Sequence, residues 1–273
     1  MGDEFVHVQE WAPGYSGYQK VWEEAFWGNP GQLVDENNWN IVTDIHVNNE
    51  WQQYTRSNQN IQISGGGTVQ LVPRINNGQW TSGRLESKYV FTPQAGRRTL
   101  AEARIRFGNA PQANKRGMWP AFWLLGDSIR HGVNWPACGE IDVMERVNGE
   151  WSAFGTVHCD REGGGSCNEP YGISARTGLA NDDWHNWRVV WDRTSNNWRD
   201  QSITWYLDGN QFHRVSGNSL NNEAAWRALG QSPVFFILNL AIGGNLPGNP
   251  DGNTWDSFGN MMEVSYVAHH VSV

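Results

Sequence analysis

The stretch Trp135–Glu150, WPACGEIDVMERVNGE, sets three carboxylates, Glu140, Asp142 and Glu145, within six residues among isoleucine, valine and methionine. These apolar neighbours favour an extended chain, in which side chains alternate between two faces. Strict alternation would turn Glu145 towards the apolar face, where an unpaired charge is costly to bury. A one-residue β-bulge near Val143–Met144 restores the phase. We therefore predict a bulged strand that carries all three carboxylates on one surface.

Three carboxylates on one surface suit glycoside hydrolysis. One carboxylate attacks the anomeric carbon while a protonated partner donates its proton to the leaving oxygen. An acid between the two helps to separate their pKa values, because like charges held close cannot all ionise easily. The acidic pattern alone also fits a solvated strand face or a cation site, so the rest of the sequence has to decide.

Composition favours one large β-domain. The chain has 273 residues with 31 glycines, 17 tryptophans and only 18% charged residues, and no linker, charge block or repeat divides it. We expect a single domain over residues 1–273, whose first segment, residues 1–20, wraps the surface. The net charge of −8 argues against nucleic acid or an anionic membrane as partner. No apolar run reaches the ~18 residues of a membrane span, and we expect a monomer.

Short alternating strands dominate the pattern. We predict strands at Ser82–Phe91, Thr99–Phe107 and Met118–Leu125, and a hairpin in SITWYLDGNQFHRV that turns at Asp208–Gly209 or Gly209–Asn210. One short helix is predicted at Asn221–Leu229, with an asparagine cap. A dozen or so strands with almost no helix indicate an all-β sandwich of the jelly-roll type.

The three cysteines indicate the cellular compartment in which the protein works. Cys159 and Cys167 flank a glycine-rich loop and can close it as a disulfide, which implies export. Cys138 then remains, and we interpret it as a buried structural thiol. The chain opens on Met1–Gly2–Asp3 without a signal peptide, and we expect that a natural signal has been removed. We therefore expect a secreted, extracellular protein.

Several segments occur in the order found in one enzyme family: NNEWQQYT, TSGRLESKYVF, GMWPAFWLLG, GEIDVMERV, FGTVH, DWHNWRVVW, ITWYLDG, FFILNLAIGGNLPG and MEVSYVAHHV. From about Trp22 to the C-terminus the chain resembles glycoside hydrolase family 16, in its laminarinase-like branch. GEIDVMERV beside WPAFWLLG is the most specific part of the resemblance. It implies a concanavalin A-like jelly roll with an open concave cleft, and endo-acting hydrolysis of a β-glucan with retention of configuration.

The resemblance also assigns roles to the acids. It implies that Glu140 is the nucleophile, that Glu145 is the general acid/base, and that Asp142 lies between them and tunes the pair. The bulged spacing matches laminarinases, whereas bacterial lichenases have one residue fewer. From the residues alone the roles of Glu140 and Glu145 are interchangeable.

Three tryptophans near the acids are candidate sugar platforms. Trp119 and Trp123 share a face because they are four positions apart, so both can line a cleft, although a core role remains an alternative for each. Trp135 precedes the acidic strand, where a subsite wall is favoured over the core.

Four polar residues are further candidates for binding substrate. The resemblance implies that Arg84 binds sugar hydroxyls and that His158, at the end of FGTVH, hydrogen-bonds substrate beside the acid/base. Surface ion pairing and a structural histidine are the alternatives. Asn49 and Asn239 each offer a donor and an acceptor to hydroxyls. His269–His270 are interpreted as exposed residues near the chain end.

A structural calcium is only weakly indicated. Family members often hold one on the convex face, using acids in the first and last strands. This chain has Glu24-Ala25-Phe26 where an acidic D-E-F is common, and Val264-Ser265-Tyr266 where V-D-Y is common. Both changes remove a hard oxygen ligand, so a calcium site would depend on backbone carbonyls.

The sequence thus predicts an extracellular endo-β-1,3-glucanase that works by double displacement, requires no cofactor and binds β-glucan. An enzyme that prefers mixed-linked β-1,3-1,4-glucan is the nearest alternative, because cleft loops decide the linkage. A non-catalytic β-glucan-binding protein and a cation-dependent structural module are alternatives from other classes. The presence of all three acids weighs against the first, and the many tryptophans weigh against the second.

Overall fold

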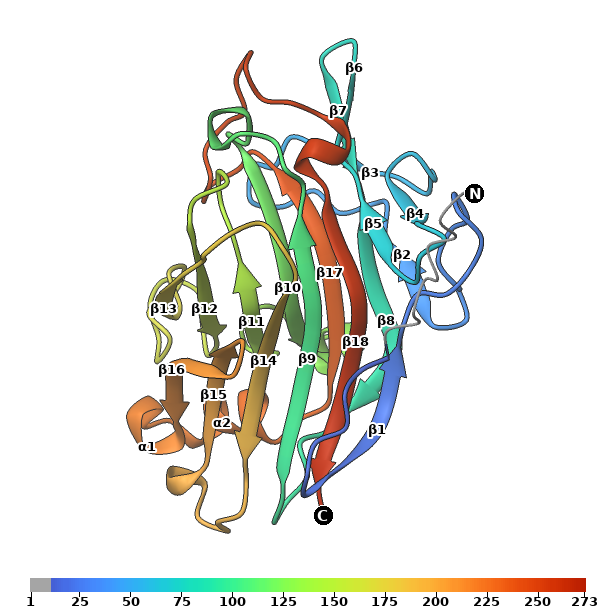
Figure 1. Ribbon diagram of the computed structural model, residues 1–273. Coiled ribbons are helices and arrows are strands. Elements are labelled where there is room, and N and C mark those ends of the chain that lie inside the picture. Colours follow the sequence, from blue (N-terminus) through green and yellow to red (C-terminus); the bar gives the residue numbers. More distant parts are fainter. Residues whose placement is uncertain (1–10) are drawn as a thin grey trace.

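The computed structural model describes residues 11–273, which form two large sheets that pack face to face (Figure 1). The first sheet has the order β16 (Asn210–Ser216), β15 (Ser202–Leu207), β14 (His185–Asp192), β9 (Arg98–Phe107), β18 (Met262–Ser272), β5 (Val69–Leu71) and β4 (Ile61–Ile63), with β1 (Tyr18–Glu24) also paired to β18. The strands run along the long axis of the molecule.

The second sheet has the order β13 (Ile173–Gly178), β12 (Ser152–His158), β11 (Glu140–Glu145), β10 (Met118–Gly126), β17 (Val234–Ile242), β8 (Arg84–Phe91) and β2 (Trp39–Ile41). A small third sheet joins β3 (Gln53–Tyr54), β7 (Gln79–Ser82) and β6 (Arg74–Asn76). In the described part of the chain, all strand pairs are antiparallel except β3 with β7. The predicted all-β jelly-roll class is confirmed.

Within residues 11–273, helical structure is confined to short connections. The helices are α1 (Gly217–Leu220) and α2 (Glu223–Gly230), and single 3₁₀ turns occur at η1 (Gln112–Asn114), η2 (Asp127–His131), η3 (Trp198–Asp200) and η4 (Ser257–Asn260). The predicted helix at 221–229 corresponds to α2, which begins after Asn222, whose side chain accepts a hydrogen bond from the Ala225 N–H.

The predicted strands agree with β8, β9 and β10 to within a residue or two, and the hairpin of β15 and β16 turns at Asp208–Gly209. One boundary differs. The run that starts at Ser82 divides at Gly83 into β7 and β8. A Cβ on Gly83 would lie 2.5 Å from the Ile61 side chain. The chain can pass Ile61 this closely only where it has no side chain.

The acidic strand β11 has the predicted bulge. Opposite β10, Trp123 pairs with Asp142 and Phe122 pairs with Met144, so that Val143 is the extra residue. The register to β12 shifts at the same place, between Asp142 and Glu145. Val143 and Met144 are both fully buried in the core between the sheets. The bulge thus lets two successive apolar side chains enter the core and returns Glu145 to the opposite face.

The first sheet supports the bulge directly. The buried indole of Trp205 on β15 donates a hydrogen bond of 2.8 Å to the backbone carbonyl of Asp142. Gly155 on β12 makes room for this indole, because a Cβ there would lie 2.5 Å from the Trp205 ring. A carbonyl that a bulge removes from the regular ladder is thereby satisfied inside the core.

Two expectations for the chain ends need correction. His269 and His270 are buried, at 3% and 0% exposure, because β18 pairs with β9 on one side and with β1 on the other. His269 contacts the Tyr89 hydroxyl, and His270 lies 3.0 Å from the carbonyl of Pro13. Of the segment expected to wrap the surface, residues 1–10 lie outside the described part, and Tyr18–Lys20 already belong to strand β1.

We expect Trp205→Phe to lower the free energy of unfolding by about 1–3 kcal/mol beyond the loss of ring size, because it leaves the Asp142 carbonyl buried without a donor. Trp187→Phe is the matched control. Trp187 is also fully buried, but its indole N–H contacts no acceptor within residues 11–273. Urea unfolding of both variants measures the difference, and equal losses would contradict the supporting role of Trp205.

Candidate active site

The three carboxylates of β11 lie on the face of the second sheet that points away from the first sheet. Ile141, Val143 and Met144 from the same strand enter the main core. Glu140 and Glu145 are partly exposed, whereas Asp142 between them is only 2% exposed. The sequence prediction of one acidic surface is confirmed, and its two end members are the ones accessible to a substrate.

An indole fixes each of the two accessible glutamates. The Trp135 N–H donates to Glu140 Oε2 at 2.9 Å, and the Trp119 N–H donates to Glu145 Oε1 at 3.0 Å. Both tryptophans are partly exposed. Each indole therefore restricts the rotation of one carboxylate. It bonds to only one of the two carboxylate oxygens.

Asp142 belongs to a buried charge network. Its Oδ2 lies 3.4 Å from Nε2 of His158, whose Nδ1 lies 2.7 Å from Oε2 of Glu169. The Glu169 side chain is completely buried and also accepts a hydrogen bond of 2.8 Å from the Cys159 N–H. A disulfide joins Cys159 and Cys167, at a Cα separation of 5.4 Å, and closes the loop that returns Glu169 to His158.

Burial and mutual repulsion favour protonation of the acids. Burial, followed by the charge of Asp142, raises the pKa of Glu140 well above its usual value. Burial and the charge of Glu145 raise the pKa of Asp142 to about 6, and burial and the charge of Glu140 raise the pKa of Glu145 to about 7. Burial opposes a charge on His158, yet Asp142, Glu169 and Glu140 together raise its pKa to about 11. At neutral pH the site thus combines an imidazolium with two glutamates, Glu140 and Glu145, whose protonated forms are favoured by burial.

A second network holds Trp123. Its N–H donates to Asn239 Oδ1 at 2.7 Å, and the Asn239 amide donates to the buried Tyr54 hydroxyl at 3.0 Å. The Arg84 guanidinium lies 5.0 Å from the centre of the Trp123 ring and forms an ion pair of 2.8 Å with Glu86. Trp123 is therefore held in place by neighbours on β17 and β8.

The strand register places these groups in one row across the sheet. Arg84 pairs with Asn239, Asn239 with Ala121, and Ala121 with Glu145. Paired residues in a sheet point to the same face. The structure thus brings Arg84, Trp119, Trp123, Trp135, His158 and Asn239 onto the face of the three acids. Asn49 differs, because it lies in an exposed loop, where its amide donates to Asn245 at 2.7 Å.

Glu169 is the main residue that sequence reasoning missed. It lies 29 positions after Glu140 and 11 after His158 in a glycine-rich loop, and no pattern marks it. The one available signal was the pair Cys159 and Cys167. A disulfide that closes this loop fixes the start of the segment that carries Glu169 two residues later.

Within residues 11–273, Glu140, Asp142 and His158 form the group of acids and histidines whose ligand atoms are close enough to hold a metal ion, within 4.8 Å of one another. The contacts favour a charge network over a cation site, because Asp142 and Glu169 face the two ring nitrogens of His158, at 3.4 and 2.7 Å, and the two acids raise the His158 pKa. The side chains at the positions considered for calcium have other surroundings. The Glu24 oxygens accept hydrogen bonds from Phe26, Asn38 and Trp39, and Ser265 is buried.

Two accessible carboxyls beside a buried acid, on an open sheet face with indoles, define the class of carboxylate-dependent glycoside hydrolases. Comparison with known proteins agrees. The model of the XgeA-like catalytic domain of glycoside hydrolase family 16 matches residues 44–186. The beta-glucanase of Rhodothermus marinus is 30% identical over 92% of this chain and 84% of its own length. The chain belongs to glycoside hydrolase family 16.

Two further relatives are similar over nearly the whole chain. The crystal structure of the endo-1,3-beta-glucanase from Streptomyces sioyaensis superposes with a TM-score of 0.89 at 32% identity, over 96% of this chain and 99% of that one. Glucan endo-1,3-beta-glucosidase A1 of Niallia circulans is 30% identical over 93% of this chain. The chain spans only 38% of the length of the Niallia protein.

We expect Glu169→Gln to lower the pKa of His158. The glutamine oxygen can still accept from the Cys159 N–H, but its amide group then faces His158 Nδ1 and favours the neutral imidazole. Asp208→Asn is the matched control, because Asp208 forms the same kind of contact, at 2.6 Å, with His185. A pH titration of the ring nitrogens by NMR measures the change. An unchanged His158 pKa in Glu169→Gln would contradict the network.

Proposed function

We propose that the chain is a secreted, endo-acting β-1,3-glucanase that hydrolyses its substrate with retention of configuration. The observation that carries the proposal is the bulge of β11, which puts Glu140 and Glu145 on one accessible face with Asp142 between them. The similarity to the endo-1,3-beta-glucanase of Streptomyces sioyaensis and to glucan endo-1,3-beta-glucosidase A1 of Niallia circulans supports the choice of linkage. The buried disulfide Cys159–Cys167 supports an extracellular location.

Glu145 suits the acid/base role. A pKa of about 7 keeps much of this carboxyl protonated at neutral pH, so it can donate its proton to the departing glycosidic oxygen. Once that oxygen has left, ionised Glu145 can remove a proton from the incoming water. The Trp119 N–H stabilises the ionised form and thereby limits the rise of this pKa.

Glu140 suits the nucleophile role once its proton is moved. The two neighbouring carboxyls, Glu140 and Asp142, interact closely enough to share a proton. When the proton resides on Asp142, Glu140 is ionised, and the His158 imidazolium and the Trp135 N–H stabilise its charge. The carboxylate can then form a bond to the anomeric carbon, which later breaks when water attacks.

The remaining polar groups would bind the sugar. Trp123 and Trp119 offer partly exposed rings on either side of Ala121, in the row that leads to Glu145. Aromatic faces and a fixed amide are the chemistry that pyranose rings require. Both steps of the reaction are assigned to side chains of this chain, so we propose that hydrolysis needs no cofactor. A chelator titration that abolishes activity would contradict this.

We expect the protein to shorten laminarin rapidly to mid-length oligosaccharides, and more slowly to shorten barley mixed-linked glucan. Glu140→Gln should lower kcat by at least about a thousandfold, and Glu145→Gln by about 10²–10⁴-fold. Wild-type activity should fall as pH rises through about 7, because Glu145 then loses its proton, and the residual activity of Glu145→Gln should lack this limb. Sizing of products over time at several pH values measures the substrate preference, the loss of activity in each variant, and the pH dependence.

The outcomes of this experiment separate the alternatives. Faster cleavage of the mixed-linked polymer would replace the β-1,3 assignment by an endo-β-1,3-1,4 activity. Binding of laminarin without cleavage of either polymer would favour a glucan-binding protein. A pH limb that persists unchanged in Glu145→Gln would contradict its role as the acid.

A further inference from the structure

Glu169 is a buried carboxylate that takes no part in either bond-making step proposed above. Its side chain is completely buried, and each of its oxygens faces a donor. Oε2 lies 2.7 Å from His158 Nδ1, and Oε1 accepts from the Cys159 N–H at 2.8 Å. Burial of a carboxylate is costly unless it is paired and hydrogen-bonded. The contact with His158 therefore offsets much of the cost of burying Glu169.

The disulfide loop holds Glu169 against His158. Glu169 and Gly164 exchange two backbone hydrogen bonds, with N···O distances of 2.6 and 2.9 Å. The disulfide Cys159–Cys167 closes the same loop, and both cysteines are fully buried. The carboxylate is thus fixed through its side chain and through its backbone, as a group that orients a neighbouring residue has to be.

The opposite edge of the His158 ring faces the acids. His158 Nε2 lies 3.4 Å from Oδ2 of Asp142, and His158 pairs with Glu140 across β11 and β12. Asp142 Oδ2 is buried and has no hydrogen-bond partner among residues 11–273. A buried carboxylate oxygen in this situation is stabilised by a positive charge nearby. The ring of His158 is placed to supply that charge.

The carboxyls that act on His158 come from β11 and from the disulfide loop: Glu140, Asp142, Glu145 and Glu169. The other sides of the ring face uncharged groups. The Trp135 ring centre lies 5.6 Å from that of His158, and a Cβ on Gly172 would lie 2.9 Å from His158 Cε1. During the proposed reaction Glu140 loses its charge when it bonds to the anomeric carbon. Glu169 is the one carboxyl of the four whose protonation neither step changes.

We propose that Glu169 is a positioning residue for hydrolysis, which keeps His158 oriented and positively charged while the acids of β11 change their protonation. The imidazolium then stabilises ionised Glu140 before it attacks, and again when water breaks the bond between Glu140 and the sugar. No bond to Glu169 forms or breaks in either step. The inference rests on the proposed function, because it requires Glu140 to act as the nucleophile.

The test is the pH dependence of kcat/KM on laminarin in Glu169→Gln, which retains the shape of the side chain and the acceptor for the Cys159 N–H but removes the charge. The acidic limb of the wild-type profile reports ionisation of the Glu140–Asp142 pair. Loss of the imidazolium should raise the pKa of that pair, so the limb should move to higher pH by about one unit or more. Glu169→Asp retains the charge and should shift the limb less than Glu169→Gln. An equal shift would contradict a role for the charge.

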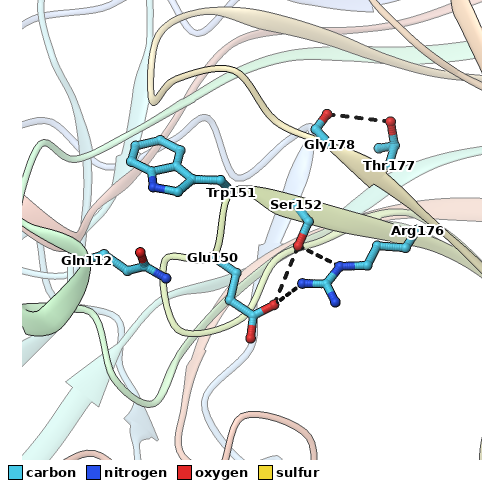
Figure 2. Close-up of a pocket in the computed structure, with 7 residues that line it drawn as sticks. All are labelled: Gln112, Glu150, Trp151, Ser152, Arg176, Thr177 and Gly178. Carbon is cyan, nitrogen blue, oxygen red and sulfur yellow. Dashed lines mark hydrogen bonds and ion pairs between the residues drawn. The ribbon is translucent and has the colours of Figure 1, made fainter.

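Glu150→Gln is the matched control at the other end of β12. Glu150 forms an ion pair with Arg176 beside a surface hollow of about 580 Å³, which Trp151 and Ser152 also line (Figure 2). The substitution also removes a carboxylate from a cation, but it does so at the start of the strand that ends at His158. It should leave the acidic limb where it is in the wild type.

Two further outcomes would overturn the role of Glu169. Loss of activity by the same factor at every pH, with the limb unchanged, would show that Glu169 only supports the fold. A lower His158 pKa in Glu169→Gln, measured by NMR, without movement of the limb would show that the ring charge does not act on the nucleophile. Glu140→Gln separates this inference from the proposed function. If that variant retains wild-type activity, Glu140 is not the nucleophile and the proposed function itself is wrong.

Discussion

Between Asp142 and Glu145, strand β11 has one residue more than the segments of β10 and β12 that pair with it, and this extra residue at Val143–Met144 sets the phase of Glu145 relative to Glu140 and Asp142. Without it, Glu145 would point into the core and an apolar side chain would replace it on the open face. The bulge is stabilised from both sides. Val143 and Met144 fill the core, and Trp205 of the other sheet satisfies the Asp142 carbonyl. The packing of the sandwich and the geometry of the acids therefore depend on each other.

The site buries ionisable side chains in a region from which a protein normally excludes charge. Because the folded-state pKa values of Asp142 and Glu145 are raised to about 6 and about 7, these acids lower stability progressively as pH rises from about 4 through those values. The pKa of His158 is also raised in the folded state, but here the shift stabilises the fold. Its contribution to stability is complete at pH values below about 6.5, the pKa of an unfolded histidine, and is lost as the pH approaches about 11. At neutral pH the imidazolium thus offsets part of the cost of the acids, and Glu169 maintains that imidazolium.

Features that depend on local side-chain alternation could be predicted from the sequence. The phase conflict at Glu145 predicted the bulge, and alternation predicted β8, β9, β10 and the hairpin of β15 and β16. The spacing of Trp119 and Trp123 placed both rings on one face. These features follow from the two-residue repeat of a strand, which can be read without knowledge of the partners.

What could not be predicted depends on which strands become neighbours. His269 and His270 resembled a polar chain end, but β18 lies between β9 and β1, so both are buried. Glu169 reaches His158 only through the folded disulfide loop. Asn49 contacts Asn245, a partner 196 positions away, and not the acids. Trp151 and Arg176 meet at one hollow only because β12 pairs with β13. Sequence spacing is silent on such long-range pairing.

The central claim is that the bulge brings Glu140 and Glu145 together as a nucleophile and an acid/base. Two carboxyls about 5–5.5 Å apart act by double displacement and retain the configuration at the anomeric carbon, whereas a wider pair admits water directly and inverts it. Proton NMR of the first sugar released from laminarin, recorded before mutarotation, measures this outcome directly. The account predicts the β-anomer. Initial release of the α-anomer would contradict it.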